Sequence, residues 1–125
     1  MDTDALYRKK TCDQIFRSGI WHAWTSVDSK CALQWEAEKR IFAVVYNSVK
    51  YYAGYQFDED GAPLAIVKEV LQHLHCDDPW SIAAWFYFPN SWIANGATPV
   101  RPKDALSRQH DVIKAAMRNT ATYIS

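Results

Sequence analysis

The 125-residue sequence predicts an α+β fold that is mainly α-helical with one β-hairpin. Apolar residues recur at helical spacing in several stretches, and one run of β-branched and aromatic residues is divided by a two-residue polar turn. Hydrophobic residues make up 49% of the chain and charged residues 22%, which is ordinary globular usage. We expect a small winged-helix-like N-terminal part over 1–54, followed by a C-terminal helical bundle over 55–125.

Two helices are predicted before the hairpin. The first covers residues 3–18, and Gly19 is suited to end it. The second begins at Ser26 or Asp28, either of which can cap its N-terminus, and extends to about Arg40.

A β-hairpin is predicted over residues 41–52. The runs Ile41–Tyr46 and Val49–Tyr52 are β-like, and Asn47-Ser48 between them is turn chemistry. Gly54 ends this unit.

Three helices are predicted after the hairpin. Pro63 suits the first turn of one of them, and Asp78 and Pro79 suit the N-cap and first position of the next, which is apolar nearly all round. The last covers about Gln109–Thr120. The first of these helices has an apolar stripe formed by Leu64, Val67, Val70, Leu71 and Leu74. The last has an apolar face formed by Val112, Ile113, Ala116 and Met117.

Two turns are predicted between the last two helices. Asn90 can cap a short turn that carries Trp92 and Ile93, and Asn95-Gly96 turns the chain.

The charge and cysteine content exclude several classes of protein. The 14 basic and 14 acidic residues balance, which argues against non-specific coating of DNA. Three widely spaced cysteines imply no disulfide framework and suit the reducing cytoplasm. No segment has the pattern of a signal peptide or a transmembrane helix, so we expect a cytoplasmic protein that does not contact membranes.

Six Trp, seven Tyr and five Phe are many rings for a chain of this length. Some of them are expected at an interface, although a core that uses large rings is the alternative. Helical spacing points Ile82, Trp85 and Phe86 inward. The rings beside the Asp-Pro and Pro-Asn turns are expected nearer a partner surface, and these are Trp80, Tyr87 and Trp92.

No pattern of catalytic residues or phosphate-binding glycines is present, so we expect neither an enzyme nor a cofactor. His73, His75 and Cys76 precede two aspartates, but the spacing favours a polar helix end over a metal site.

The segment 26–52 suggests DNA binding as an alternative function. A helix followed by a hairpin resembles the recognition helix and wing of a winged helix-turn-helix. Phosphate contacts would come from Lys30, Lys39, Arg40 and Lys50. The other interpretation is a helix and hairpin that only pack together.

A family resemblance joins several of these features. The run Tyr51–Asp58 is followed at consistent distances by Gly61 and Pro63, and then by further short matches. These are Asp78-Pro79-Trp80, Ile82-Ala83, Trp85-Phe86, Pro89-Asn90, Trp92-Ile93, Gly96 and Pro99. Over about residues 41–118 the chain resembles the MbcA-like toxin-binding domain of the Xre/MbcA/ParS antitoxin family.

The resemblance implies a binding function. The partner would be a RES-type toxin that degrades NAD, and the C-terminal helical domain would hold the toxin and block its active site. An N-terminal helix-turn-helix would bind the promoter of its own operon, and the protein would self-associate, most simply as a homodimer. The partner-binding residues would include Trp80, Tyr87, Trp92 and Asn95. A winged-helix transcriptional regulator without a toxin partner is the alternative.

Overall fold

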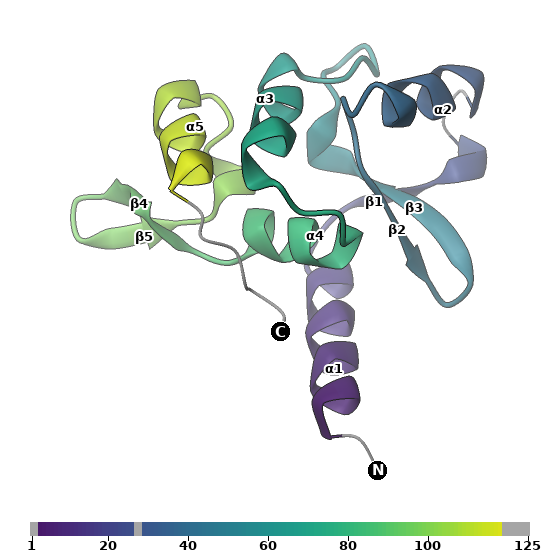
Figure 1. Cartoon of the computed structure of the whole chain (residues 1–125), viewed down its shortest axis with the longest axis horizontal. Coiled ribbons are helices and arrows are strands. Elements are labelled where there is room, and N and C mark those ends of the chain that lie inside the picture. The colour runs from purple at the N-terminus through teal and green to yellow at the C-terminus, as the bar shows by residue number, and fades with distance from the viewer. Residues whose placement is uncertain (1–2, 27–28, 119–125) are drawn as a thin grey trace.

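The computed structural model describes residues 3–26 and 29–118 and has a mixed α+β fold, as the sequence predicted (Figure 1). The described part contains five α-helices and two antiparallel sheets, one of three strands and one of two. None of the helices in these ranges has the length and apolarity needed to cross a lipid bilayer.

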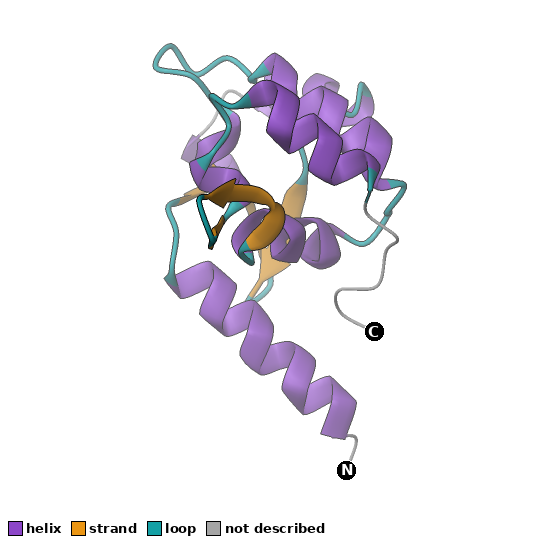
Figure 2. Ribbon diagram, turned by 90° about the vertical axis from the view of Figure 1, so that its left-hand side faces the viewer, coloured by secondary structure: helices purple, strands orange, loops and turns teal. Residues whose placement is uncertain are grey.

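Helix α1 (Thr3–Arg17) confirms the first predicted helix and extends away from the rest of the molecule (Figure 2). The C-terminal half of the helix packs on the core. Ile15 is buried, and the ring of Phe16 stacks on Tyr46 with the ring centroids 4.0 Å apart.

The three-stranded sheet has the order β1-β3-β2, with β1 (Trp21–Ala23), β2 (Ala43–Tyr46) and β3 (Val49–Ala53). Strands β2 and β3 confirm the predicted hairpin. Asn47 and Ser48 both have positive φ, at 49° and 66°, the conformation of a tight hairpin turn. Strand β1 was not predicted, because it is short and is defined only by its pairing with β3.

Helix α2 (Ser29–Ala37) is shorter than predicted and ends before Arg40. Its last turn closes with Lys39 in the left-handed region at φ 57°, and the amide of Arg40 donates to the carbonyl of Trp35 at 2.8 Å. Ser26 lies in a separate 3₁₀ turn and does not adjoin the helix, while Asp28 lies outside the described residues.

Helices α3 (Ala65–Leu74), α4 (Pro79–Tyr87) and α5 (Gln109–Met117) form the second half, with α3 and α5 side by side. The Asp78 cap of α4 is confirmed, because its carboxylate accepts a hydrogen bond from the amide of Trp80 at 3.3 Å. Pro63 does not start α3. It pairs with Phe57 in an isolated β-bridge, and the helix begins two residues later.

A second hairpin, β4 (Asn90–Asn95) and β5 (Thr98–Val100), stands where a short turn was predicted. The prediction of a single hairpin was therefore wrong, because the described residues contain two. Asn90 does accept a hydrogen bond from the amide of Trp92 at 2.9 Å, but the chain then continues in extended conformation. The turn at Gly96 is confirmed, with φ 61°.

One hydrophobic core crosses both predicted regions of the chain. Ile15, Phe42 and Val44 share it with buried residues of α3, α4 and α5. The inward positions of Ile82, Trp85 and Phe86 are confirmed. Met117 differs from its prediction, because its side chain is 63% exposed at the end of α5.

Candidate functional site

The β4–β5 hairpin and the end of α5 carry one exposed ring, Trp92, and we define the hairpin face by Trp92, Asn95 and Arg118. Trp92 is half exposed, and the guanidinium of Arg118 lies 4.3 Å from its ring centroid. Cation–π contact of this kind holds a ring in place without burying it.

Trp92 lies in an irregular stretch of β4, because the register with β5 shifts between Asn90 and Ala94. The next residue, Ile93, is fully buried in the core. Ile93 therefore anchors the stretch to the core, while Trp92 is exposed to solvent.

Arg108 ties the tip of the hairpin to the start of α5. Its guanidinium donates to the carbonyl of Ala94 and to Oδ1 of Asn95, both at 3.2 Å. It also forms an ion pair with Asp111 at 2.7 Å. Asn95 is therefore exposed but held in a fixed orientation.

Tyr87 lies inside the protein, whereas the sequence favoured a position near a partner surface. Its side chain is 6% exposed, and its hydroxyl accepts a hydrogen bond from Gln14 of α1 at 3.0 Å. The guanidinium of Arg101 lies 4.3 Å from the ring centroid and donates to the Tyr87 carbonyl. Arg101 lowers the pKa of Tyr87, against the effect of burial.

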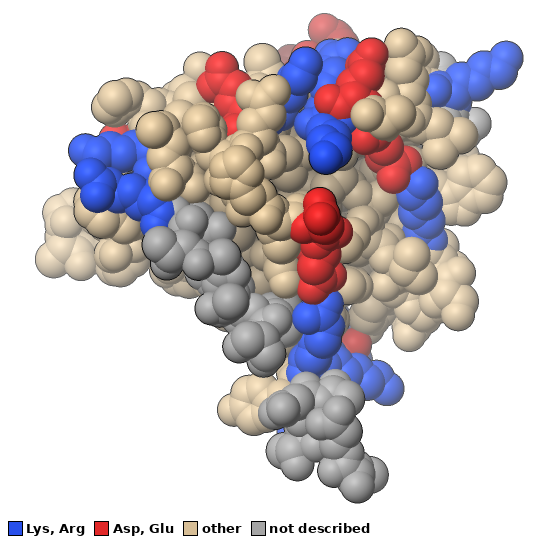
Figure 3. Space-filling model, viewed as in Figure 1, with Lys and Arg blue, Asp and Glu red and all other residues tan. Residues whose placement is uncertain are grey.

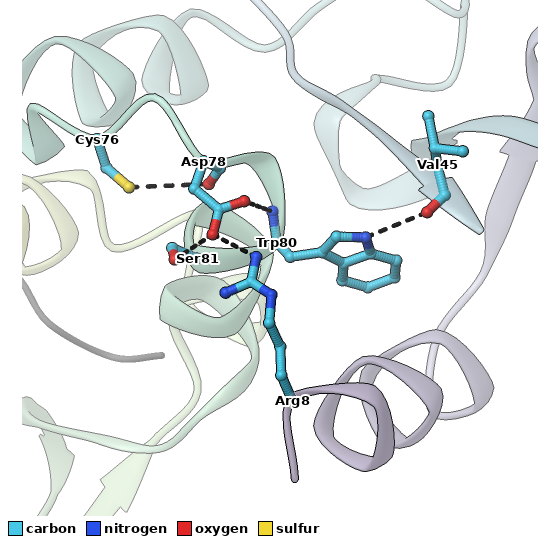
Figure 4. Close-up of polar contacts among 6 residues, drawn as sticks. All are labelled: Arg8, Val45, Cys76, Asp78, Trp80 and Ser81. Carbon is cyan, nitrogen blue, oxygen red and sulfur yellow. Dashed lines mark hydrogen bonds and ion pairs between the residues drawn. The ribbon is translucent and has the colours of Figure 1, made fainter. Parts of the chain in front are cut away.

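Trp80 is also used internally (Figure 4). Its indole N–H donates to the carbonyl of Val45 on strand β2 at 3.2 Å, and its ring lies beside Trp21 and Tyr46. Of the four residues expected at a partner surface, only Trp92 and Asn95 are well exposed.

The cap of α4 next to Trp80 is part of a polar cluster (Figure 4). The carboxylate of Asp78 forms an ion pair with Arg8 of α1 and accepts a hydrogen bond from Ser81 at 2.8 Å. Burial of Asp78 opposes its ionisation, but these hydrogen bonds and the charge of Arg8 outweigh it, so its pKa lies below the usual value. The cluster joins α1 to α4.

The four residues suggested for DNA binding lie around α2 and the first hairpin. Lys50 is bound to Glu36 at 2.6 Å, and Arg40 lies 3.5 Å from Glu38, so acidic neighbours offset both charges. Lys30 and Lys39 are exposed. On the face shown in Figure 3, basic and acidic side chains are interspersed, and neither sign spans the face.

The residues suggested as a polar helix end lie where α3 ends. His75 closes that helix in the left-handed conformation, at φ 50°, and the thiol of Cys76 donates to the Asp78 carbonyl at 3.7 Å. Within residues 3–26 and 29–118, no three His, Cys, Asp or Glu side chains are placed to hold a metal ion.

Sequence reasoning missed three arginines of this region, Arg101, Arg108 and Arg118. Their partners Tyr87, Ala94 and Trp92 lie 14 or more residues away in the chain. Only the spacing of Arg108 and Asp111 was a local signal.

Comparison of the chain with protein-family models, curated proteins and solved structures finds no match.

Proposed function

We propose that this protein is an antitoxin-like binding module that sequesters and inhibits a partner protein through the hairpin face. The observation that carries the proposal is Trp92, which is 50% exposed on β4 and has the guanidinium of Arg118 over its ring. Trp and Arg are the residue types that dominate the energy of protein–protein interfaces.

The fixed geometry of the hairpin supports this function. Ile93 and Arg108 hold the strand and its tip before any partner binds. A side chain that is already ordered loses less conformational entropy on binding, so more of its contact energy contributes to affinity.

The identity of the partner rests on the resemblance over residues 41–118. On that basis we propose a RES-type toxin that degrades NAD, held by the C-terminal half of the chain. The proposal extends to a homodimer, whose presence analytical ultracentrifugation would establish.

Co-expression with a RES-domain toxin tests the proposal. We expect the two proteins to co-purify and the cellular NAD concentration to be preserved. Trp92→Ala should weaken binding by about thirtyfold or more, since a Trp hot spot contributes at least about 2 kcal/mol. Trp24→Ala is the matched control, because Trp24 is 46% exposed and lies outside the hairpin face. Equal losses in the two variants would contradict a specific role for the face.

A second candidate function is DNA binding by the N-terminal half, with regulation of its own promoter. One observation favours it: α2 directly precedes the β2–β3 hairpin, the order of a recognition helix and its wing. The charge pairing of Arg40 and Lys50 counts against it. A salt-dependent mobility shift with the upstream DNA would support this function. If the shift were unchanged when Lys39, Arg40 and Lys50 are all replaced by Ala, this surface would be excluded as the DNA-binding site.

A further inference from the structure

A cleft of about 520 Å³ opens where α1 and β1 meet α4, and we call it the Ile20 cleft. Five segments surround it: the end of α1, strand β1, helix α4 and two 3₁₀ turns, Gly54–Gln56 and Pro102–Asp104. It shares no lining residue with the hairpin face. A volume of this size is typical of small-molecule sites, which bury most of their ligand.

Small residues leave the space open, and apolar side chains line it. Ala83 of α4 and Ile15 of α1 are buried in its wall. Gly54 allows the chain to pass closely, because a Cβ there would lie 3.0 Å from the carbonyl of Ile20. Ile20 itself lines the cleft and is 75% exposed, the largest fraction among the large apolar side chains of the described residues.

Tyr55 supplies a polar group to this apolar site. Its ring packs against Phe86, with the ring centroids 5.1 Å apart, and the residue lines the cleft with intermediate exposure. Burial raises the pKa of Tyr55 well above its ordinary value, so the hydroxyl keeps its proton at neutral pH. A phenol carries one O–H donor, which an acceptor on a bound molecule can take up.

The charged residues of the cleft offer no net charge to a ligand. Of the lining residues, Lys103 and Asp104 carry opposite full charges and pair with each other at 3.0 Å, and His22 is a further polar side chain of the wall. An ionic ligand would lose its hydration without gaining an unpaired counter-charge. The site therefore suits a neutral molecule.

We propose that the Ile20 cleft binds a small, uncharged and largely apolar organic molecule that carries a hydrogen-bond acceptor such as a carbonyl oxygen. The apolar body lies against Ile15, Ile20 and Ala83, and the acceptor takes the hydrogen bond of Tyr55. This site is independent of the proposed partner-binding function, since the two surfaces have different residues.

The test uses 6-propionyl-2-(dimethylamino)naphthalene, an uncharged fluorescent ketone, titrated with the full chain. We expect saturable one-to-one binding with a blue-shifted emission. Tyr55→Phe removes only the hydroxyl and should weaken binding about three- to tenfold, the range for one hydrogen bond. Ala83→Leu places a larger side chain in the cleft and should prevent binding.

Tyr7→Phe is the matched control, because Tyr7 is 73% exposed on α1 and does not line the cleft. It should leave the affinity unchanged. Absence of saturable binding, or wild-type affinity in Ala83→Leu, would overturn the site. Wild-type affinity in Tyr55→Phe would overturn the assigned hydrogen bond, even if Ala83→Leu prevents binding. Tyr55→Phe removes one oxygen atom and should not disturb folding, so it remains informative if Ala83→Leu fails to fold.

Discussion

The indole N–H of Trp80 donates a hydrogen bond to the main-chain carbonyl of Val45, 3.2 Å away, across the outer edge of strand β2. Strand β2 pairs with β3 on one side only. An open edge of this kind can pair with another chain, and covering it removes that liability. Trp80 therefore ties α4 to the sheet and protects the edge.

We predict that Trp80→Phe lowers the free energy of unfolding by about 1 kcal/mol, the usual contribution of one hydrogen bond. The ring remains, so the contacts with Trp21 and Tyr46 are largely kept. Urea unfolding measures the change, and Trp92→Phe is the control that should leave stability unaltered. If Trp80→Phe kept full stability and instead weakened partner binding, Trp80 would belong to the interface.

The Arg8–Asp78 pair makes the stability of α1 on α4 depend on pH. The pKa of Asp78 is lower in the folded protein, so its contribution to stability is fully present above the unfolded pKa of about 4 and is lost progressively as the pH falls from there through the folded pKa. Both side chains are 38% exposed, which limits the ion pair to a few tenths to about 1 kcal/mol.

Three variants separate the ion pair from the cap. Arg8→Ala should destabilise the protein at pH 7, and its difference from the wild type should be smaller at pH 3, below the unfolded pKa. Asp78→Asn keeps a capping oxygen and should behave like Arg8→Ala, whereas Asp78→Ala also loses the cap, which is worth about 1 kcal/mol. Thermal unfolding at both pH values measures this. A difference between Arg8→Ala and wild type that is the same at pH 3 and pH 7 would contradict the ion-pair origin.

The side chain of Gln56 forms main-chain hydrogen bonds of the kind that a neighbouring strand would form. Its fully buried side chain accepts a hydrogen bond from the amide of Phe42 at 2.8 Å and donates to the carbonyl of the same residue at 3.0 Å. It also donates to the carbonyl of Ala53 at 3.3 Å. The chain before β2 thereby satisfies its main-chain groups inside the protein.

We predict that Gln56→Leu costs about 3 kcal/mol or more, because it leaves two buried main-chain groups of Phe42 without partners. Gln34→Leu on the exposed side of α2 is the control and should change stability by less than about 0.5 kcal/mol. Guanidinium unfolding followed by Trp fluorescence measures both. A cost for Gln56→Leu as small as that of the control would show that water replaces the lost bonds.

The parts of the fold that the sequence predicted are those with local signals. Asp78-Pro79 starts α4 and Asn47-Ser48 turns the first hairpin, and both signals act within four residues. Strand β1 has no such signal, because it exists through pairing with β3 about 30 residues later. Asn90 misled the prediction, since its bond to the Trp92 amide is compatible with either a helix cap or an extended strand.

The same distinction holds for the candidate site. Periodicity correctly placed Trp85 inside, but it could not separate Trp80 from Trp92. The position of each ring depends on a distant partner, Val45 for Trp80 and Arg118 for Trp92. Such contacts arise only after the chain has folded, so no spacing rule predicts them.

Lys39 closes α2 in a conformation that favours glycine. Its φ is 57°, and its amide donates to the carbonyl of Glu36 at 3.0 Å. The amide of Arg40 donates to the carbonyl of Trp35 at 2.8 Å. This is the Schellman arrangement of a helix C-terminus, in which glycine is the usual residue at the left-handed position. A side chain there costs about 1 kcal/mol or more of backbone energy.

We predict that Lys39→Gly raises the free energy of unfolding by about 0.5–1 kcal/mol, because relief of the left-handed strain exceeds the added flexibility of the unfolded chain. Lys39→Ala removes the same charge but keeps the Cβ, so it should give no gain, and urea unfolding distinguishes the two. Equal stabilisation in both variants would assign the effect to the charge. Lys39 is also a suggested phosphate contact. If both variants lost the mobility shift with the upstream DNA, the charge of Lys39 would be needed for DNA binding, which would explain a lysine at this strained position.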